Sequence, residues 1–220
     1  MTNLNTTINA ITTLPALREL FPPVNPRSAL KELPLLDVHA KRFISLSPFV
    51  VMSSYGADGR ADTSPRGGDA GFVKVVDSGT LLIADSPGNN RLDSLENIIA
   101  TGQVGLLFMV PGVDETLRVN GTAVLSIDET ELKLCEDSRR VPKLVIRVNV
   151  HACYLHCAKA LMRSDLWNAN KHLGGSQLPS MGEMIHDQLA GKVSPETVVE
   201  TQEQMLERYQ QTLESTYIRP

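Results

Sequence analysis

Two short segments combine hydroxyl, guanidinium and glycine groups in a way that suits the binding of a phosphorylated, planar ligand. The first, DTSPRGGD, occupies residues 62–69, and the second, DSPGNNRLD, occupies residues 85–93. In the second, Gly88 permits close approach of the backbone and Arg91 supplies a full charge. A helix that starts after this loop presents unpaired amide N–H groups and a partial positive charge to a phosphate. Taken alone, each segment is better explained as an ordinary turn with a surface arginine.

A second group of reactive side chains, His151, Cys153, His156 and Cys157, contains the residue types that usually bind zinc. On a regular β-strand the first, second and fourth of these share one face and His156 points away, so four ligands do not converge. We therefore expect no metal site. A Cys–His nucleophile is disfavoured as well, because side chains on opposite faces of a strand do not hydrogen-bond to each other.

The composition excludes several classes of protein. With 42% apolar and 21% charged residues the chain is an ordinary globular protein. A net charge of -4 argues against a nucleic-acid partner, which requires a basic surface. No run approaches the roughly 20 apolar residues of a membrane span, and residues 1–11 do not resemble a secretory signal. Three cysteines are an odd count, which favours a reducing, cytoplasmic setting over a disulfide framework.

The elements that must position the polar segments are mostly short β-strands. Strands are predicted over residues 49–55, 60–64, 72–76, 80–85, 104–110, 116–126 and 143–157, most of them separated by turn residues. The strongest signal is the alternation of Ile146, Val148 and Val150 with Arg147 and Asn149. Six or seven short strands with few helices predict an antiparallel barrel.

Helices are expected around this barrel and after it. Asp37 is the predicted N-cap of a helix that runs to about residue 46, and a second helix covers residues 93–100. Residues 16–20 form a short helical turn within a proline-rich arm. Two more helices are predicted over 181–189 and 195–213, the latter opened by Ser194 and Pro195. The chain is therefore divided into an arm (1–36), a barrel domain (37–167) and a helical extension (168–220).

The order and spacing of the two polar segments resemble those of the FMN-binding split barrels of the pyridoxamine 5'-phosphate oxidase superfamily. The resemblance covers about residues 37–167 and is closest to an uncharacterised bacterial branch, with Ser-Pro-Arg-Gly followed by a Pro-Gly-Asn-Asn-Arg loop. It implies a mainly β fold with peripheral helices, namely a six-stranded antiparallel split barrel. It also implies a homodimer with FMN at the subunit interface.

The same resemblance implies which residues bind the cofactor. Its motifs place flavin, ribityl and phosphate contacts at Thr63, Ser64, Pro65, Arg66, Gly67, Asp85, Asn89, Asn90, Arg91 and Thr116. The segment 156–167 resembles the tail of that branch and is expected to close over the flavin from the partner subunit, through Lys159 and Trp167. No catalytic side chain is assigned, because FMN itself supplies the redox chemistry.

The expected function is that of an FMN-dependent oxidoreductase of unknown substrate. The alternatives are a flavin carrier without turnover, and a haem- or metal-binding protein on the same barrel, for which the His151 to Cys157 cluster is the sequence support. The chain departs from the true oxidases at its C-terminus, residues 214–220, which lacks their substrate-gripping strand. Pyridoxamine phosphate is therefore not the expected substrate.

Overall fold

The computed structural model describes residues 9–86, 88–137, 141–173, 177–192 and 200–214. The chain divides into two compact units, Met1–Glu32 and Leu33–Pro220. The described part of the first unit contains helices α1 (Leu14–Glu19) and α2 (Pro26–Leu30), and each has a proline in its first turn. None of the described residues of this unit is buried. The helical turn predicted at residues 16–20 is confirmed, with slightly different limits, while α2 was not predicted.

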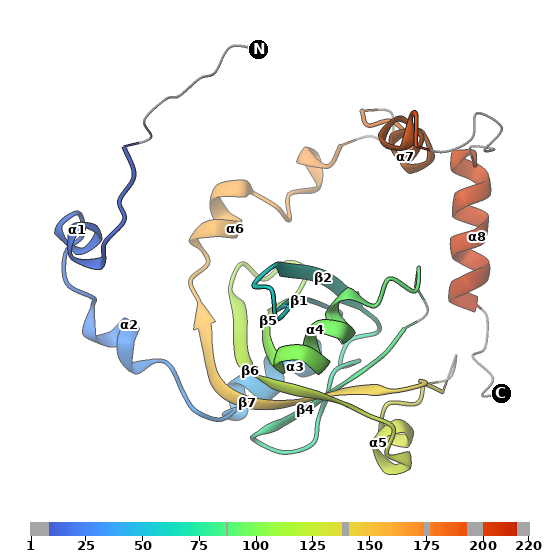
Figure 1. Cartoon of the computed structure of the whole chain (residues 1–220). Coiled ribbons are helices and arrows are strands. Elements are labelled where there is room, and N and C mark those ends of the chain that lie inside the picture. Colours follow the sequence, from blue (N-terminus) through green and yellow to red (C-terminus); the bar gives the residue numbers. More distant parts are fainter. Residues whose placement is uncertain (1–8, 87, 138–140, 174–176, 193–199, 215–220) are drawn as a thin grey trace. The chain divides into compact units, whose positions relative to one another are not determined.

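The second unit is built on one antiparallel sheet of seven strands (Figure 1). The strands are β1 (Phe49–Tyr55), β2 (Ala61–Gly67), β3 (Lys74–Val75), β4 (Thr80–Ala84), β5 (Gln103–Met109), β6 (Thr116–Ser126) and β7 (Val145–His156). Their order in the sheet is β2-β1-β5-β6-β7-β4-β3. The sheet is not closed, since β2 and β3 lie at its two edges. The prediction of a six-stranded barrel is therefore wrong in strand number, because the two-residue β3 pairs with β4 and adds a seventh strand.

Short turns explain why neighbouring segments pair. Gly59 adopts a left-handed φ of 78° in the turn between β1 and β2, and its amide donates to the Gly56 carbonyl at 2.9 Å. In the turn between β3 and β4, the Asp77 carboxylate accepts from the Gly79 amide at 2.7 Å. The two hairpins predicted at these positions are confirmed by the antiparallel registers of β1 with β2 and of β3 with β4.

One face of the sheet carries the larger of two buried apolar clusters, and two helices contribute side chains to it. Buried apolar side chains alternate along the strands, at Val50, Met52, Leu106, Phe108, Leu117, Val119, Ile146 and Val148. Helix α3 (Val38–Leu46) adds Ala40 and Ile44 to this core, and its predicted N-cap is confirmed because the Asp37 carboxylate accepts from the Ala40 amide at 2.8 Å.

Helix α4 (Asp93–Thr101) is fixed to β1 and β2 by side-chain hydrogen bonds. Ser94 Oγ donates to Asp62 Oδ2 at 2.6 Å, and Asn97 Nδ2 donates to Ser54 Oγ at 3.1 Å. Leu95 and Ile98 on the same helix are buried in the core. These contacts place the loop before α4, which contains the second polar segment, beside β2, the edge strand that contains most of the first.

A β-bulge at His151 interrupts the alternation of β7. Asn120 on β6 pairs with Ala152, whereas Gly121 pairs with Val150, so His151 has no partner in the ladder. The chain approaches closely at this point, because a Cβ on Gly121 would overlap the Asn149 carbonyl oxygen. The extra residue reverses the inward and outward positions after it, so Val150 and Cys153 are both buried and His151 is exposed.

The remaining helices lie after β6 and β7. Helices α5 (Glu129–Leu134) and α6 (Lys159–Ser164) and the 3-10 helix η1 (Ala169–Lys171) were not predicted. The prediction of a helix over 181–189 is confirmed by α7 (Met181–Leu189). The last helix, α8 (Gln202–Glu214), begins later than predicted, and the expected Ser194 cap and Pro195 lie outside the described residues.

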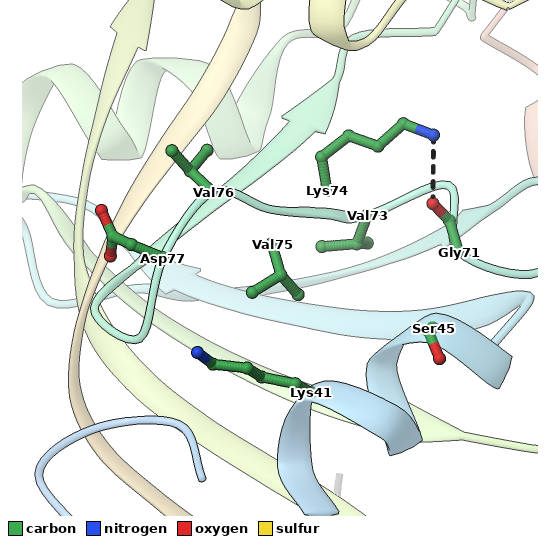
Figure 2. Close-up of a pocket in the computed structure, with 8 residues that line it drawn as sticks. All are labelled: Lys41, Ser45, Gly71, Val73, Lys74, Val75, Val76 and Asp77. Atoms are coloured by element: carbon green, nitrogen blue, oxygen red, sulfur yellow. Dashed lines mark hydrogen bonds between the residues drawn. The ribbon is translucent and has the colours of Figure 1, made fainter. Parts of the chain in front are cut away.

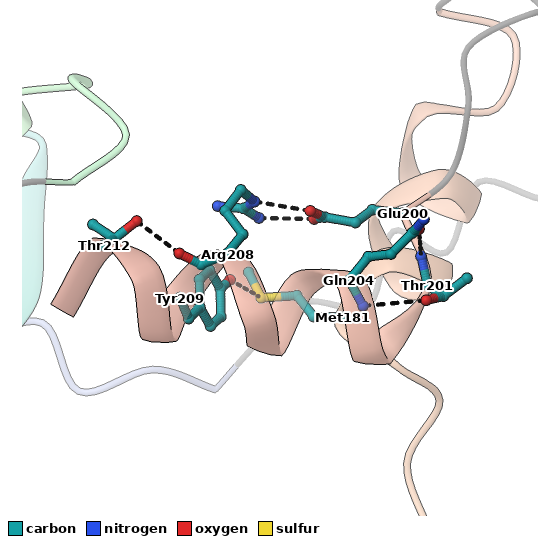
Figure 3. Close-up of polar contacts among 7 residues, drawn as sticks. All are labelled: Met181, Glu200, Thr201, Gln204, Arg208, Tyr209 and Thr212. Atoms are coloured by element: carbon teal, nitrogen blue, oxygen red, sulfur yellow. Dashed lines mark hydrogen bonds and ion pairs between the residues drawn. The ribbon is translucent and has the colours of Figure 1, made fainter. Parts of the chain in front are cut away.

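Polar contacts join α8 to the residues before it and to α7 (Figure 3). Arg208 forms a bidentate ion pair with Glu200, and Tyr209 Oη donates to Met181 Sδ at 3.4 Å. Thr201 and Gln204 exchange two hydrogen bonds, in the manner of a capping box. Local contacts of this kind stabilise the start of α8.

Candidate functional site

The register of β2 divides the first polar segment between the two faces of the sheet. Ser64 pairs with Met52 and Arg66 with Val50, and both of these β1 partners are fully buried. Directly paired residues lie on the same face, so Ser64 and Arg66 point toward the core. Three further residues, Thr63, Pro65 and Gly67, lie on the outer face and are exposed.

Arg66 meets the end of β4 across the open side of the sheet. Its Nη1 atom lies 3.8 Å from Asp85 Oδ1, and the exposed fractions of the two side chains are only 16% and 23%. Because β1, β5, β6 and β7 separate β2 from β4 in the sheet order, the sheet must curl until its two halves face each other. The structure therefore brings together two of the predicted site residues, Arg66 and Asp85, from distant parts of the sheet.

The Arg66 guanidinium retains an unused donor. Its Nε atom is buried and has no hydrogen-bond partner among the described residues. A buried donor left without an acceptor costs about 1–3 kcal/mol. A ligand rich in acceptor oxygens would remove that cost, and both the phosphate and the ring carbonyls of a flavin provide such oxygens.

The second polar segment is an exposed loop whose arginine is already paired. Arg91 Nε donates to Asp93 Oδ2 at 2.8 Å, and the Arg91 amide donates to Asn89 Oδ1 at 3.1 Å. Hydrogen bonding to Arg91 lowers the pKa of Asp93 from its ordinary value. Asn90 has a left-handed φ of 58°. The sequence reasoning named Asn89, Asn90 and Arg91 for the site but missed Asp93 as a competitor for the guanidinium, although its spacing of two residues was visible.

Helix α4 begins directly after this loop without a side-chain cap. Its N-cap is Leu92, in the left-handed conformation with φ 61°. The apolar Leu92 side chain cannot accept a hydrogen bond from the first amides of the helix. The first turn carries Asp93 and Glu96, whose charges oppose the binding of an anion. The helix start therefore offers amide donors to a phosphate, provided that Arg91 supplies the positive charge.

Thr116 lies on the outer face of the sheet, away from Arg66. It is itself only 9% exposed, alternates with the fully buried Leu117 on β6 and pairs with His156 on β7. Two residues further along the same face, Arg118 Nη1 donates to Tyr154 Oη at 2.9 Å. The rings of Tyr154 and His156 are 5.6 Å apart. Arg118 and Tyr154 were not among the predicted site residues, and without the strand register nothing indicated that they meet.

The tail after β7 is attached to the sheet through its single tryptophan. Trp167 Nε1 donates to the carbonyl of Val113 at 3.1 Å, in the connection between β5 and β6 of the same chain. Lys159, the first residue of α6, is exposed. The expected closure of both residues over a flavin from the partner subunit stays a prediction.

One described cavity contains none of the predicted site residues. It measures about 340 Å³ and lies between α3 and residues 71–77 (Figure 2). Lys41 Nζ donates to Ser78 Oγ at 2.9 Å, and Lys74 Nζ donates to the Gly71 carbonyl at 3.2 Å. The two ammonium groups point to different ends of the cavity, so their charges do not converge on one ligand.

The histidine and cysteine cluster does not form a metal site within the described part of the chain. Because of the bulge, His151 is exposed while Cys153 is buried, which corrects the expectation that they share a face. Cys157 lies beyond the end of β7 and is exposed. No group of three or more His, Cys, Asp or Glu side chains among the described residues is placed to hold an ion. The described helices likewise include none that is long and apolar enough to cross a bilayer.

Comparison with solved structures finds several proteins that match about half of this chain. HupZ from Group A Streptococcus is 18% identical, with a TM-score of 0.45 over 54% of this chain and 91% of its own. An FMN-binding protein from Syntrophomonas wolfei is 10% identical, with a TM-score of 0.41 over 54% of this chain and 84% of its own. An FAD-binding protein from Mycobacterium smegmatis is 14% identical, with a TM-score of 0.40 over 56% of this chain and 97% of its own.

The family assignment rests on the sequence model of the family. A comparison with curated proteins finds no match. The model described as pyridoxamine 5'-phosphate oxidase matches residues 36–157, which is more than half of the chain and contains all seven strands and the Arg66–Asp85 pair. The protein therefore belongs to the pyridoxamine 5'-phosphate oxidase family.

Proposed function

We propose that the protein binds FMN and works as an FMN-dependent oxidoreductase whose substrate is not pyridoxamine phosphate. The family is one of flavin-binding proteins, and the observation that carries the choice is the Arg66 guanidinium. It is largely buried beside Asp85 and keeps a buried Nε donor without an acceptor among the described residues. A bound flavin would satisfy this donor.

The proposed roles of the residues follow from their positions. Arg66 and Ser64 face the interior of the curled sheet, where they can orient the ligand, while Arg91 and the uncapped start of α4 can hold a phosphate. When bound, FMN supplies the hydride or electron chemistry. A cation near the ring stabilises the negative charge of the reduced flavin, because charges interact strongly where water is excluded. Arg66 is therefore proposed to orient the ring and raise its reduction potential.

The primary test is the absorbance spectrum of the purified protein, with mass identification of the released ligand. Flavin bands and the mass of FMN are expected. NAD(P)H-dependent bleaching of these bands would separate an oxidoreductase from a carrier that only holds flavin. A Soret band in place of flavin bands would contradict the proposal and favour a haem protein.

The phosphate role of Arg91 is tested with two ligands. Charge-assisted hydrogen bonds contribute about 1.5–3 kcal/mol each. The change Arg91→Ala is therefore expected to weaken FMN binding by roughly 10- to 100-fold, at about 1.4 kcal/mol per factor of ten. Riboflavin, which lacks the phosphate, should bind with unchanged affinity.

Asp93 provides the matched variant for this test. Since its carboxylate holds Arg91 in the absence of a phosphate, Asp93→Asn should release the guanidinium and strengthen FMN binding while leaving riboflavin unaffected. Equal losses for FMN and riboflavin in Arg91→Ala would move the phosphate site to another cation, with Arg66 as the first candidate.

We also propose that the protein is a homodimer with the flavin at the subunit interface. The outer face of β1 and β5 carries Phe49, Val51, Leu107 and Met109, which are all partly exposed. Burying apolar surface of this kind contributes about 25 cal/mol per Å², which favours association. Light scattering on the FMN-loaded protein should give the mass of two chains, and a stable monomer with full FMN occupancy would contradict this proposal.

A further inference from the structure

Arg118 is a half-buried cation on the outer face of the sheet, outside the residues proposed to hold FMN. It lies on β6, between Leu107 on β5 and Tyr154 on β7 in the same row of the sheet. Its neighbours two residues away along the strand are Thr116 and Asn120, which are both uncharged. None of these four neighbours, on the same strand or on the adjacent strands, carries a charge that could neutralise Arg118.

Among the described residues, Arg118 differs from the other half-buried arginines. Arg66 faces Asp85, and Arg147 is paired with Glu131. No carboxylate of the described residues pairs with Arg118, which contacts the hydroxyl and the ring of Tyr154. Partial burial of a charge is costly unless an opposite charge compensates it. This half-buried guanidinium, without a carboxylate partner among the described residues, is therefore available to bind an anion.

Tyr154 holds the guanidinium in place without neutralising it. The Tyr154 hydroxyl accepts from Nη1 at 2.9 Å, and the ring centroid lies 5.4 Å from Cζ, within the range of a cation–π interaction. The Tyr154 ring in turn stacks obliquely on His156, at 5.6 Å, and His156 pairs with Thr116 across the strands. Tyr154, itself packed against His156, thus fixes the direction of Arg118, and a guanidinium held in this way loses little entropy when it binds.

We infer that Arg118, oriented by Tyr154 and His156, binds an oxyanion group, a carboxylate or a phosphate, of the second reactant of the flavin. This inference rests on the proposed function. Thr116, which the family resemblance places at the flavin ring, is two residues from Arg118 on the same face, about 7 Å along the strand. Arg66 lies on the opposite face of the sheet, so in the proposed dimer the ring at the subunit interface would be bordered by Arg66 of one copy and by the outer face that carries Thr116 and Arg118 of the other. A reactant held by its anionic group at Arg118 would thus reach the ring beside Thr116.

The test follows the Nε–H signal of Arg118 by NMR in the full-length protein. The protein is titrated with methyl phosphate and, separately, with acetate at constant ionic strength, and each titration is done with and without FMN. The signal is assigned by its loss in Arg118→Gln. At least one of the two anions is expected to shift it saturably, and the one with the higher affinity identifies the oxyanion class. The variant Tyr154→Phe loses the hydroxyl but keeps the charge of Arg118. In this variant the anion should bind 2- to 5-fold more weakly, a loss of about 0.4–1 kcal/mol in binding free energy.

The matched control is Arg147→Gln, which removes the same charge from a half-buried arginine that already has a carboxylate partner. It should leave the anion titration unchanged within 2-fold. No saturable shift at Arg118, or the same affinity in Tyr154→Phe and the wild type, would overturn the inference.

Two further measurements on Arg118→Gln separate this inference from the proposals on which it rests. FMN affinity should be unchanged within about 3-fold, and a larger loss would place Arg118 in the cofactor site instead. The mass in solution should also be unchanged, whereas loss of a dimer would show that the missing anion is a carboxylate of a second copy. If the protein binds no FMN but the Arg118 signal still shifts with the anion, the anion site stands and the proposed function fails.

Discussion

At the scale of single residues, burial decides which of the three thiols can react. Cys135 and Cys153 are buried, and burial raises the pKa of each thiol from its ordinary value of 9.0 to about 11. Cys157 is exposed. Because the thiolate is the reactive form, the first two should be inert near neutral pH.

Labelling with an aromatic disulfide at pH 8 should therefore modify one thiol per chain rapidly and the other two only as the protein unfolds. The rapid phase should disappear in Cys157→Ser and persist in Cys135→Ser. Rapid reaction of two or three thiols in the folded protein would contradict the placement of Cys135 and Cys153.

The raised pKa values also predict a pH dependence of stability. A thiol whose pKa is higher in the folded than in the unfolded chain stabilises the fold below the unfolded pKa, and this contribution is lost as the pH rises from about 9 to about 11. The slope is at most about 1.4 kcal/mol per pH unit for each thiol. The free energy of unfolding, measured with urea at several pH values in this window, should fall less steeply with pH in Cys153→Ala than in the wild type, whatever the change in absolute stability. Equal pH slopes would contradict the raised pKa of Cys153.

At the scale of elements, the bulge in β7 depends on a glycine in the neighbouring strand. Because a Cβ at Gly121 would overlap the Asn149 carbonyl, the change Gly121→Ala must displace the backbone of β6 or β7. We expect a loss of about 2–4 kcal/mol in the free energy of unfolding, which is the upper range for strained or overpacked positions.

Gly88→Ala is the matched control for this prediction. The nearest atom to a Cβ at Gly88 is 3.9 Å away, so stability should change by less than about 0.5 kcal/mol. Equal effects of the two substitutions in urea unfolding would show that the close approach at the bulge does not constrain the sheet.

At the scale of the whole molecule, the boundary between the two units predicts which part of the N-terminal segment stabilises the sheet. No described residue before Leu33 is buried, whereas Leu36 is 3% exposed and belongs to the core. Leu33 also exchanges two backbone hydrogen bonds with Cys153 on β7, at 2.9 and 2.8 Å.

Deletion of residues 1–32 should therefore leave the melting temperature within about 2 °C of the wild type, since residues 9–32, the described part of this segment, include no buried side chain. Deletion of residues 1–36 also removes Leu36 and the Leu33 hydrogen bonds. It should cost about 2–5 kcal/mol, the usual range for loss of a buried leucine. Similar melting temperatures for the two truncated proteins would contradict this boundary.

Local sequence determined the strands, their turns and the principal caps of this protein. Runs of strand-forming residues between turn residues defined β1 and β6 to the residue, and Asp37 identified the start of α3, because these signals depend only on near neighbours. The motifs of residues 62–69 and 85–93 were sufficient to predict the family, which the match over residues 36–157 confirms.

Only the tertiary structure decided which of the candidate residues meet. The approach of Arg66 to Asp85 depends on the curl of a seven-stranded sheet, and the contact of Arg118 with Tyr154 depends on the register of β6 with β7. The bulge at His151 separated a histidine and a cysteine that a regular strand would place on one face. Such contacts arise from backbone pairing between distant segments, and a shift of one residue in that pairing turns each side chain to the opposite face, so local patterns do not determine them.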